Sequence, residues 1–179
     1  MNRIFARAGL SATLAALAWA GIAQAHITLE TRKAPAGSTY KAVFRVPHGC
    51  AGSPTKSITV DIPGGMINVK PMPHPGWQLT TRKGKLPSPY VSEHGTTISE
   101  GVIEVEWSGG ALPDDQYDEF VLRGMLPREP GRMLYFPVIQ HCEKGTNNWT
   151  AIPEAGKTTH DDSEPAPGLM LTAPAANGR

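Results

Sequence analysis

The chain has almost no net charge, only two cysteines and no long apolar run after its first 25 residues. Its 179 residues carry 17 Lys and Arg against 16 Asp and Glu without a long basic segment, which argues against nucleic acid as a partner. No later stretch is apolar enough to span a bilayer, so we expect no membrane anchor in the mature chain. Helical periodicity is weak, and no motif specific to hydrolytic catalysis stands out, so we expect a β-rich protein that is not an enzyme.

The first 25 residues have the pattern of a secretory signal peptide. Arg3 and Arg7 give the positive start, the apolar stretch 8–20 follows, and segment 23–25 (Ala-Gln-Ala) is a small-x-small cleavage site. The alternative is an N-terminal membrane anchor, but the apolar stretch is short for a bilayer span. We therefore expect cleavage after residue 25, a mature chain that begins at His26, and a periplasmic or secreted protein.

Apolar and polar residues alternate in several short runs, and turns rich in Gly and Pro separate them. Such alternation is typical of strands with one buried and one solvated face. Several short strands at this spacing predict a two-sheet antiparallel β-sandwich, in one domain over residues 26–153. The runs cover residues 39–46, 58–62, 103–107, 120–122 and 133–139.

The composition changes after Pro153, where residues 154–179 are rich in Ala, Pro, Gly, Thr and acidic side chains. This composition predicts a largely extended tail. Its one apolar cluster, residues 169–171, is the segment that would pack on the sandwich as one more strand.

Cys50 and Cys142 are the only cysteines. In an oxidising compartment an even pair predicts a disulfide, which here would tie an early strand to a late one. Closing so long a loop contributes about 4–5 kcal/mol in the chain-entropy model. The sequence leaves open the alternative of two free thiolate metal ligands, with His141 beside Cys142.

His26 is the residue with the most distinctive chemistry, because cleavage would leave it at a free N-terminus. A terminal histidine offers its α-amine and its imidazole Nδ1 to one metal ion, whereas the backbone nitrogen of an internal histidine is an amide. Copper(II) favours nitrogen donors and has the highest affinity among the common divalent metals. The alternative is an exposed first residue without a role. The sequence predicts a Cu(II) site at His26.

A further ligand has to come from another part of the chain. Glu30 is the nearest carboxylate in sequence, but in a strand it lies about 13 Å from His26. His141 is a possible second imidazole, and Trp149 is either part of the core or a wall of the site. The candidate carboxylates on other strands, among which spacing does not choose, are Glu100, Glu104, Glu106 and Glu119.

Several short motifs together resemble the YcnI-like copper-binding domain family. The chain opens with Ala-His-Ile-Thr-Leu at 25–29 and Ala-Gly-Ser at 36–38, and continues with Phe-Arg-Val-Pro-His-Gly-Cys at 44–50 and Gly-Ser-Pro-Thr at 52–55. Each motif alone is weak, but their order is specific and covers about residues 26–153. The later matches are segments 71–73, 75–77, 107–110, 117–120 and 140–149.

The resemblance implies an immunoglobulin- or fibronectin-III-like β-sandwich with one Cu(II) site, in which the mature N-terminal histidine acts as a single-histidine brace. His26 matches that ligand position. Glu100 and Glu119 fall in segments that resemble glutamate-containing segments of the family, and Trp149 matches a family tryptophan. Some relatives have a C-terminal membrane anchor that this chain lacks, which favours a freely diffusing protein.

The leading hypothesis is an exported protein that captures, buffers or hands over copper, with a periplasmic copper chaperone as its protein partner. A second hypothesis is a copper oxidase resembling lytic polysaccharide monooxygenases, which would need a second histidine such as His141. A third is a metal-free adhesion or partner-binding module, because sandwich domains often have that role.

Overall fold

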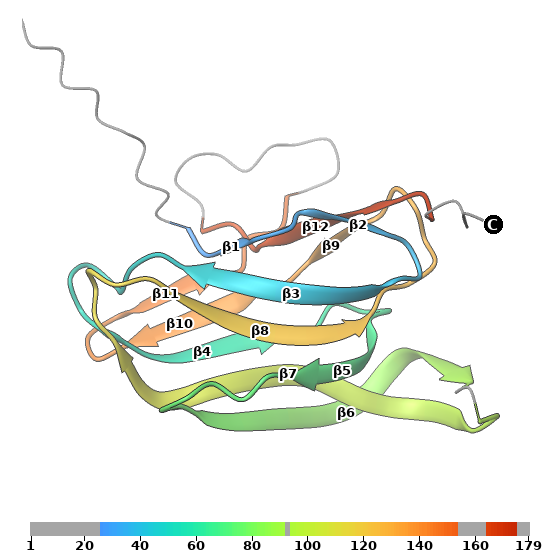
Figure 1. Ribbon diagram of the computed structural model, residues 1–179, viewed down its shortest axis with the longest axis horizontal. Helices are drawn as coiled ribbons and strands as arrows, with labels where there is room; N and C mark the ends of the chain where they lie inside the picture. The colour runs from blue at the N-terminus through green and yellow to red at the C-terminus, as the bar shows by residue number, and fades with distance from the viewer. Residues whose placement is uncertain (1–25, 92–93, 154–163, 175–179) are drawn as a thin grey trace, which may run out of the picture.

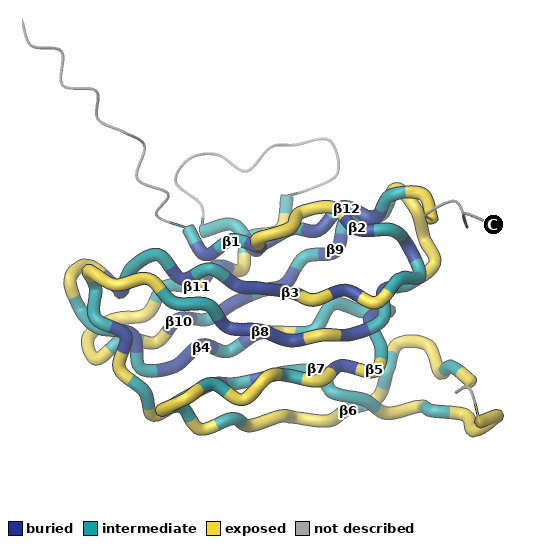
Figure 2. Tube along the Cα trace, viewed as in Figure 1, coloured by how far each residue is buried: buried dark blue, intermediate teal, exposed yellow. Residues whose placement is uncertain are grey.

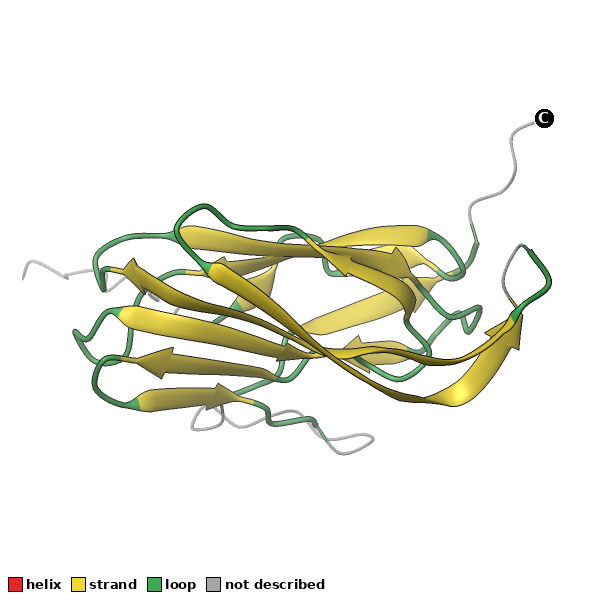
Figure 3. Cartoon of the chain, turned by 90° about the horizontal axis from the view of Figure 1, so that it is seen from below, coloured by secondary structure: helices red, strands yellow, loops and turns green. Residues whose placement is uncertain are grey.

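In the computed structural model, the described residues 26–91, 94–153 and 164–174 form three packed β-sheets without a helix (Figures 1 and 3). The predicted signal peptide and most of the predicted tail lie outside these residues. None of the described residues belongs to a helix that is long and apolar enough to cross a membrane.

The first sheet has four antiparallel strands in the order β1-β3-β8-β5, and the second has five in the order β11-β10-β4-β7-β6. The first contains β1 (Thr28–Leu29), β3 (Thr39–Val46), β8 (Asp118–Met125) and β5 (Ile67–Pro71). The second contains β11 (Thr146–Trp149), β10 (Val138–Cys142), β4 (Thr55–Asp61), β7 (Thr97–Leu112) and β6 (Gln78–Val91). The predicted all-β, immunoglobulin-like antiparallel sandwich is confirmed.

The third sheet joins both ends of the domain in the order β2-β12-β9. Strand β12 (Gly168–Thr172) lies between β2 (Lys33–Pro35), to which it is parallel, and β9 (Met133–Tyr135). Leu169 and Leu171 on β12 are at most 1% exposed. The apolar cluster of the expected tail is therefore part of the core, and the folded chain continues beyond residue 153.

The core fills the space between the sheets, where buried strand faces meet (Figure 2). On β3, Tyr40, Ala42 and Phe44 are buried as predicted, whereas Val43 on the opposite face is also buried, so the alternation is not strict. Phe44 packs edge-to-face on Phe136, and Trp107 packs against Phe120. Alternation with one apolar face explains why these runs form half-buried strands.

The run 133–139, expected to be one strand, is divided between two sheets. Residues of β9 pair with β12, whereas β10 pairs with β4, and Phe136 and Pro137 lie between them. Because proline has no backbone N–H to donate to a ladder, the chain changes sheets there at little cost. The Pro137 carbonyl still accepts a hydrogen bond from the Asp61 N–H.

Strands β6 and β7 extend beyond the sandwich as a two-stranded ribbon, whose far end is mostly exposed (Figures 1 and 2). At the opposite end of this strand pair, inside the sandwich, Trp77 packs over Gly110. A Cβ at Gly110 would lie 2.2 Å from the indole, so only glycine admits the ring.

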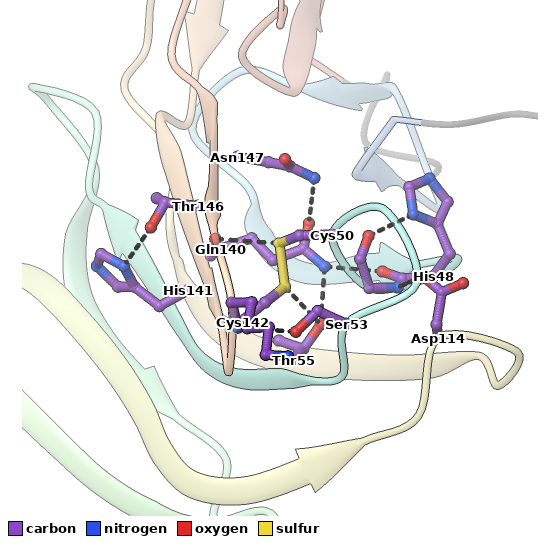
Figure 4. Close-up of a disulfide and its surroundings, with 12 residues drawn as sticks. His48, Cys50, Ser53, Thr55, Asp114, Gln140, His141, Cys142, Thr146 and Asn147 are labelled. Carbon is purple, nitrogen blue, oxygen red and sulfur yellow. Dashed lines mark hydrogen bonds between the residues drawn. A yellow bond between two sulfur atoms is a disulfide. The ribbon is translucent and has the colours of Figure 1, made fainter.

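Cys50 and Cys142 form the predicted disulfide, with an S–S distance of 2.05 Å and a Cα–Cα distance of 5.9 Å. It links the loop after β3 to the end of β10 (Figure 4). The bond ties the four-stranded sheet to the five-stranded sheet at one end of the sandwich. The alternative of free thiolate ligands is excluded for this structure.

Candidate functional site

His26 lies immediately before β1, at the edge of the first sheet. Its imidazole packs edge-to-face on the indole of Trp149, with ring centroids 5.3 Å apart and planes at 72°. Trp149 ends β11, the edge strand of the second sheet, and is only 5% exposed. The start of the described fold is therefore held between edge strands of two sheets.

Two surface hollows meet at His26. The larger, about 420 Å³, is formed by the first residues of the domain and by the segment before β12, with Arg32 and Met133 at its sides. The smaller, about 300 Å³, is lined by His26, Thr28, Arg45, Pro47 and Tyr117. His26 is thus accessible from both sides, although Trp149 covers one edge of its ring.

A row of charged side chains crosses the outer face of the first sheet beside the smaller hollow. Strand register places Thr28 opposite Arg45 and Arg45 opposite Glu119. The Arg45 guanidinium lies 3.3 Å from Glu30 Oε1 and 3.9 Å from Glu119 Oε1. One arginine therefore lies between two carboxylates, which leaves an excess of negative charge, and these side chains are all partly exposed.

Tyr117 closes this group by donating a hydrogen bond from its hydroxyl to Glu119 Oε1. Burial raises the pKa of Tyr117 to about 12, and the hydrogen bond and negative charge of Glu119 add to the rise. The phenol therefore stays protonated at neutral pH and acts as a donor. Glu119 Oε2 makes no hydrogen bond to any residue that the structure describes.

Trp149 is held by a buried amide. Its indole N–H donates to Gln140 Oε1 at 3.1 Å, and Asn147 donates to the same oxygen at 3.4 Å. Gln140 Nε2 donates to the His48 carbonyl at 2.7 Å and to Thr55 Oγ1 at 2.8 Å (Figure 4). Gln140 is 1% exposed, and its donors and acceptor are all used, so the network holds the indole in one orientation.

Of the predicted partners, the structure places Trp149 in contact with the His26 ring. Glu119 itself lines neither hollow, but it accepts a hydrogen bond from Tyr117, which lines the smaller hollow together with His26. Glu119 was one of four carboxylates among which sequence spacing could not choose.

The other three carboxylates are on β7 and line neither hollow at His26. Glu100 is exposed opposite Lys85, in the part of the ribbon that projects away from β1 (Figures 1 and 3). Arg82 donates two hydrogen bonds to Glu104, at 2.7 and 3.2 Å, which lower the pKa of that carboxyl. Glu106 pairs in register with Thr59 and Thr80. The structure does not bring Glu100, Glu104 or Glu106 to His26.

His141 does not face His26 either. Its Nδ1 is 3.0 Å from Thr146 Oγ1, on the side of β10 opposite to Gln140 (Figure 4). Neighbouring residues of a strand point to opposite faces, so the inward position of Gln140 turns His141 outward. Among the described residues, no three His, Cys, Asp or Glu side chains surround a common point.

Sequence reasoning missed Arg45, Tyr117 and Gln140 as parts of this region, and it set Glu30 aside by distance along the chain. Only the register of β1, β3 and β8 shows that Arg45 bridges Glu30 and Glu119. The sequence could have indicated the role of Gln140, because this residue lies two positions after Val138 and therefore faces the same, buried side of the strand. A polar residue in a buried alternating position indicates a hydrogen-bond network.

A family model described as a domain of unknown function (DUF1775) matches residues 26–171. Among solved structures, the chain is similar to an uncharacterized protein from Nocardia farcinica described as having an immunoglobulin-like fold. That match has 23% identity and a TM-score of 0.60, and it covers 82% of this chain and 98% of the other. No match was found among curated proteins. Because the family model spans most of the sequence, the chain belongs to the DUF1775 family, which is the YcnI-like domain.

Proposed function

We propose that the chain, cleaved after Ala25, is an exported protein that binds Cu(II) through the α-amine and imidazole of His26. The observation that carries this proposal is the placement of His26, which stands at the start of the folded domain against a fixed, buried Trp149. A terminal residue on a flexible segment would have to be ordered by the metal. Here the fold orders it beforehand, which lowers the entropic cost of binding.

The donors suit copper. An amine and an imidazole are both nitrogen ligands of the kind that Cu(II) prefers, and together they form a chelate. The α-amine has an ordinary pKa near 8, so binding at neutral pH releases a proton and strengthens as pH rises. The two hollows beside His26 leave room for further ligands and for a partner to approach.

Glu119 is the best-placed further ligand, through its Oε2 atom. Its Oε1 is held by Tyr117, which fixes the carboxylate while leaving the second oxygen free of described partners. Arg45 competes for the same carboxylate from 3.9 Å. This competition weakens the third ligand, and a weak third ligand suits a protein that releases its copper to a chaperone. Trp149 supplies an apolar wall that excludes water from one side of the imidazole.

Copper capture, buffering or handover outside the cytoplasm therefore fits the site better than oxidative catalysis. A copper oxidase with a second histidine needs another imidazole beside the first. Among the residues described around the two hollows, His26 is the only histidine.

The test is a Cu(II) titration of the correctly cleaved chain, followed by quenching of tryptophan fluorescence and by electron paramagnetic resonance. The matched control carries one additional alanine before His26, which keeps the imidazole and converts its α-amine into an amide. We expect much weaker binding by the extended chain and by His26→Ala. Equally tight binding by the cleaved and extended chains would overturn the proposal. Mass spectrometry establishes the N-terminus of each sample.

A further inference from the structure

We propose that the outer face of strands β3, β8 and β5 is a second binding site, for a soluble amphipathic anion that carries a phosphate or carboxylate group. The site shares no residue with the His26 region and does not depend on copper binding. It consists of a row of three cations, Lys41, Arg123 and Lys70, which we term the cation ladder. An apolar surface lies beside the ladder.

The strand register itself brings the three cations together. Lys41 on β3 is directly opposite Arg123 on β8, and Lys70 on β5 is opposite Arg123 from the other side. Directly opposite residues share one face, with Cβ atoms about 4.5–5.5 Å apart. All three residues are exposed. Like charges directly opposite each other destabilise a sheet.

No described acidic side chain offsets this repulsion. None of the three cations takes part in an ion pair with a residue that the structure describes. The nearest acid along β8 on the same face is Glu119, four residues from Arg123, which is about 13 Å along a strand. Salt at physiological concentration screens charges beyond about 8 Å, and Glu119 is already bound to Arg45 and Tyr117.

The ladder borders a hollow of about 370 Å³ whose lining is mainly apolar. Besides the three cations, it is lined by Pro71, Met72, Pro73, Val121 and Leu122. Met72 is 50% exposed, and its backbone N–H donates to the Val121 carbonyl at 2.8 Å, which fixes the segment after β5 beside β8. A small-molecule site typically combines such an apolar lining with a few polar groups and has a volume of about 300–1,000 Å³.

In the proposed site, the three cations bind the anionic group of the ligand and the apolar lining contacts its hydrocarbon part. The planar guanidinium of Arg123 suits a bidentate contact with a phosphate or carboxylate, and the flanking lysines add positive charge from both sides. The apolar part of the ligand lies against Met72 and the neighbouring prolines. Three exposed lysine and arginine residues give only a weak attraction to an anionic membrane, so a soluble ligand is favoured.

The test is isothermal titration calorimetry of the mature chain with hexyl phosphate, inorganic phosphate and hexanol. We expect saturable binding of hexyl phosphate, weaker binding of phosphate and none of hexanol. Arg123→Gln should weaken hexyl phosphate binding by more than about tenfold, as expected for loss of a charge-assisted hydrogen bond. Met72→Ser should reduce the preference for hexyl phosphate over phosphate.

Lys85→Gln is the matched control for Lys41→Gln, because Lys85 is an exposed lysine on β6, away from the ladder. Lys41→Gln and Lys70→Gln should weaken hexyl phosphate binding, and Lys85→Gln should leave it unchanged. Equal weakening by all three, or no saturable binding, would overturn the proposal. Retention on phosphatidylglycerol vesicles without binding of hexyl phosphate would also overturn it, in favour of a membrane surface. Circular dichroism confirms that each variant is folded.

Discussion

Two regions on the outer face of the same strand pair, β3 and β8, use charge in opposite ways. Near His26, Arg45 is placed between Glu30 and Glu119, and its charge is offset by both carboxylates. Toward the other end, Arg123 is placed between Lys41 and Lys70. Register decides which side chains meet, and the sign of the neighbours decides whether an arginine is paired within the protein or is available to a ligand.

Gln140→Leu should have the largest effect and should affect the His26 region alone, because the buried amide of Gln140 supports Trp149 and makes no contact with the cation ladder. The change removes the hydrogen bonds that Gln140 makes to the Trp149 N–H, the His48 carbonyl and Thr55 Oγ1. We expect a loss of about 2–4 kcal/mol in the free energy of unfolding, measured by urea denaturation. Tryptophan fluorescence should shift to the red as Trp149 loses its hydrogen bond, whereas hexyl phosphate binding at the cation ladder should not change.

Asn147→Ala is the matched control, because it removes only the long 3.4 Å hydrogen bond at the edge of the same network. We expect it to cost less than about 1 kcal/mol. If the two variants were equally stable, Gln140 would not be the residue that supports Trp149.

A charge reversal at Arg123 tests whether the three cations of the ladder repel one another. Arg123→Glu converts the ladder into Lys-Glu-Lys, which resembles the arrangement at Arg45 with the signs exchanged. We expect the free energy of unfolding to rise by about 0.5–1 kcal/mol at low salt and the gain to shrink as salt is added. Thermal denaturation at two salt concentrations measures this. A loss of stability would show that the cations of the ladder do not repel one another.

Arg45→Gln removes the central charge of the group near His26 and should have a smaller effect on the free energy of unfolding. The side chains of Arg45, Glu30 and Glu119 are all about 40% or more exposed, so solvent screens their attraction and the loss should be under about 1 kcal/mol. Glu119 would also be released from competition. Copper affinity should therefore rise by up to about fivefold, measured by Cu(II) titration. A fall in affinity would argue against Glu119 as the further ligand.

The smallest expected effect at neutral pH is that of Tyr117→Phe. The pKa of Tyr117 is raised from 10.0 to about 12, so the folded state favours the neutral phenol. Its contribution to stability is fully present below pH 10 and is lost as pH rises through 12. Titration of tyrosine absorbance should show two late-ionising groups, because burial also raises the pKa of Tyr40 to about 12. Tyr117→Phe should remove one of them; if both remained, Tyr117 would not be the source.

The sequence was sufficient to predict the strands with one apolar and one polar face, such as β3, because that pattern is local. It also predicted the Cys50–Cys142 bridge, since no other pairing exists. The family resemblance pointed to Trp149 as part of the His26 site, and the structure shows the two rings in contact. Glu119 was among the carboxylates considered as further ligands.

Other features depend on pairing between distant segments, which composition does not reveal. Glu30 meets Arg45 only because β1 pairs with β3 in one register. The cation ladder requires β3, β8 and β5 to be neighbours, and a shift by one residue would turn its side chains inward. Glu100 matched a family segment, yet its strand continues into a ribbon that carries it away from His26.

The larger hollow at His26 also affects the order in which the fold is completed during synthesis. Its walls come from residues 26–29 and from residues 165–168, and β2 gains its parallel neighbour only when β12 is present. The N-terminal segment therefore remains without part of its packing until almost the whole chain has been made. The hollow beside His26 is therefore complete only when residues 165–168 have joined the fold, so the two ends of the domain depend on each other for packing.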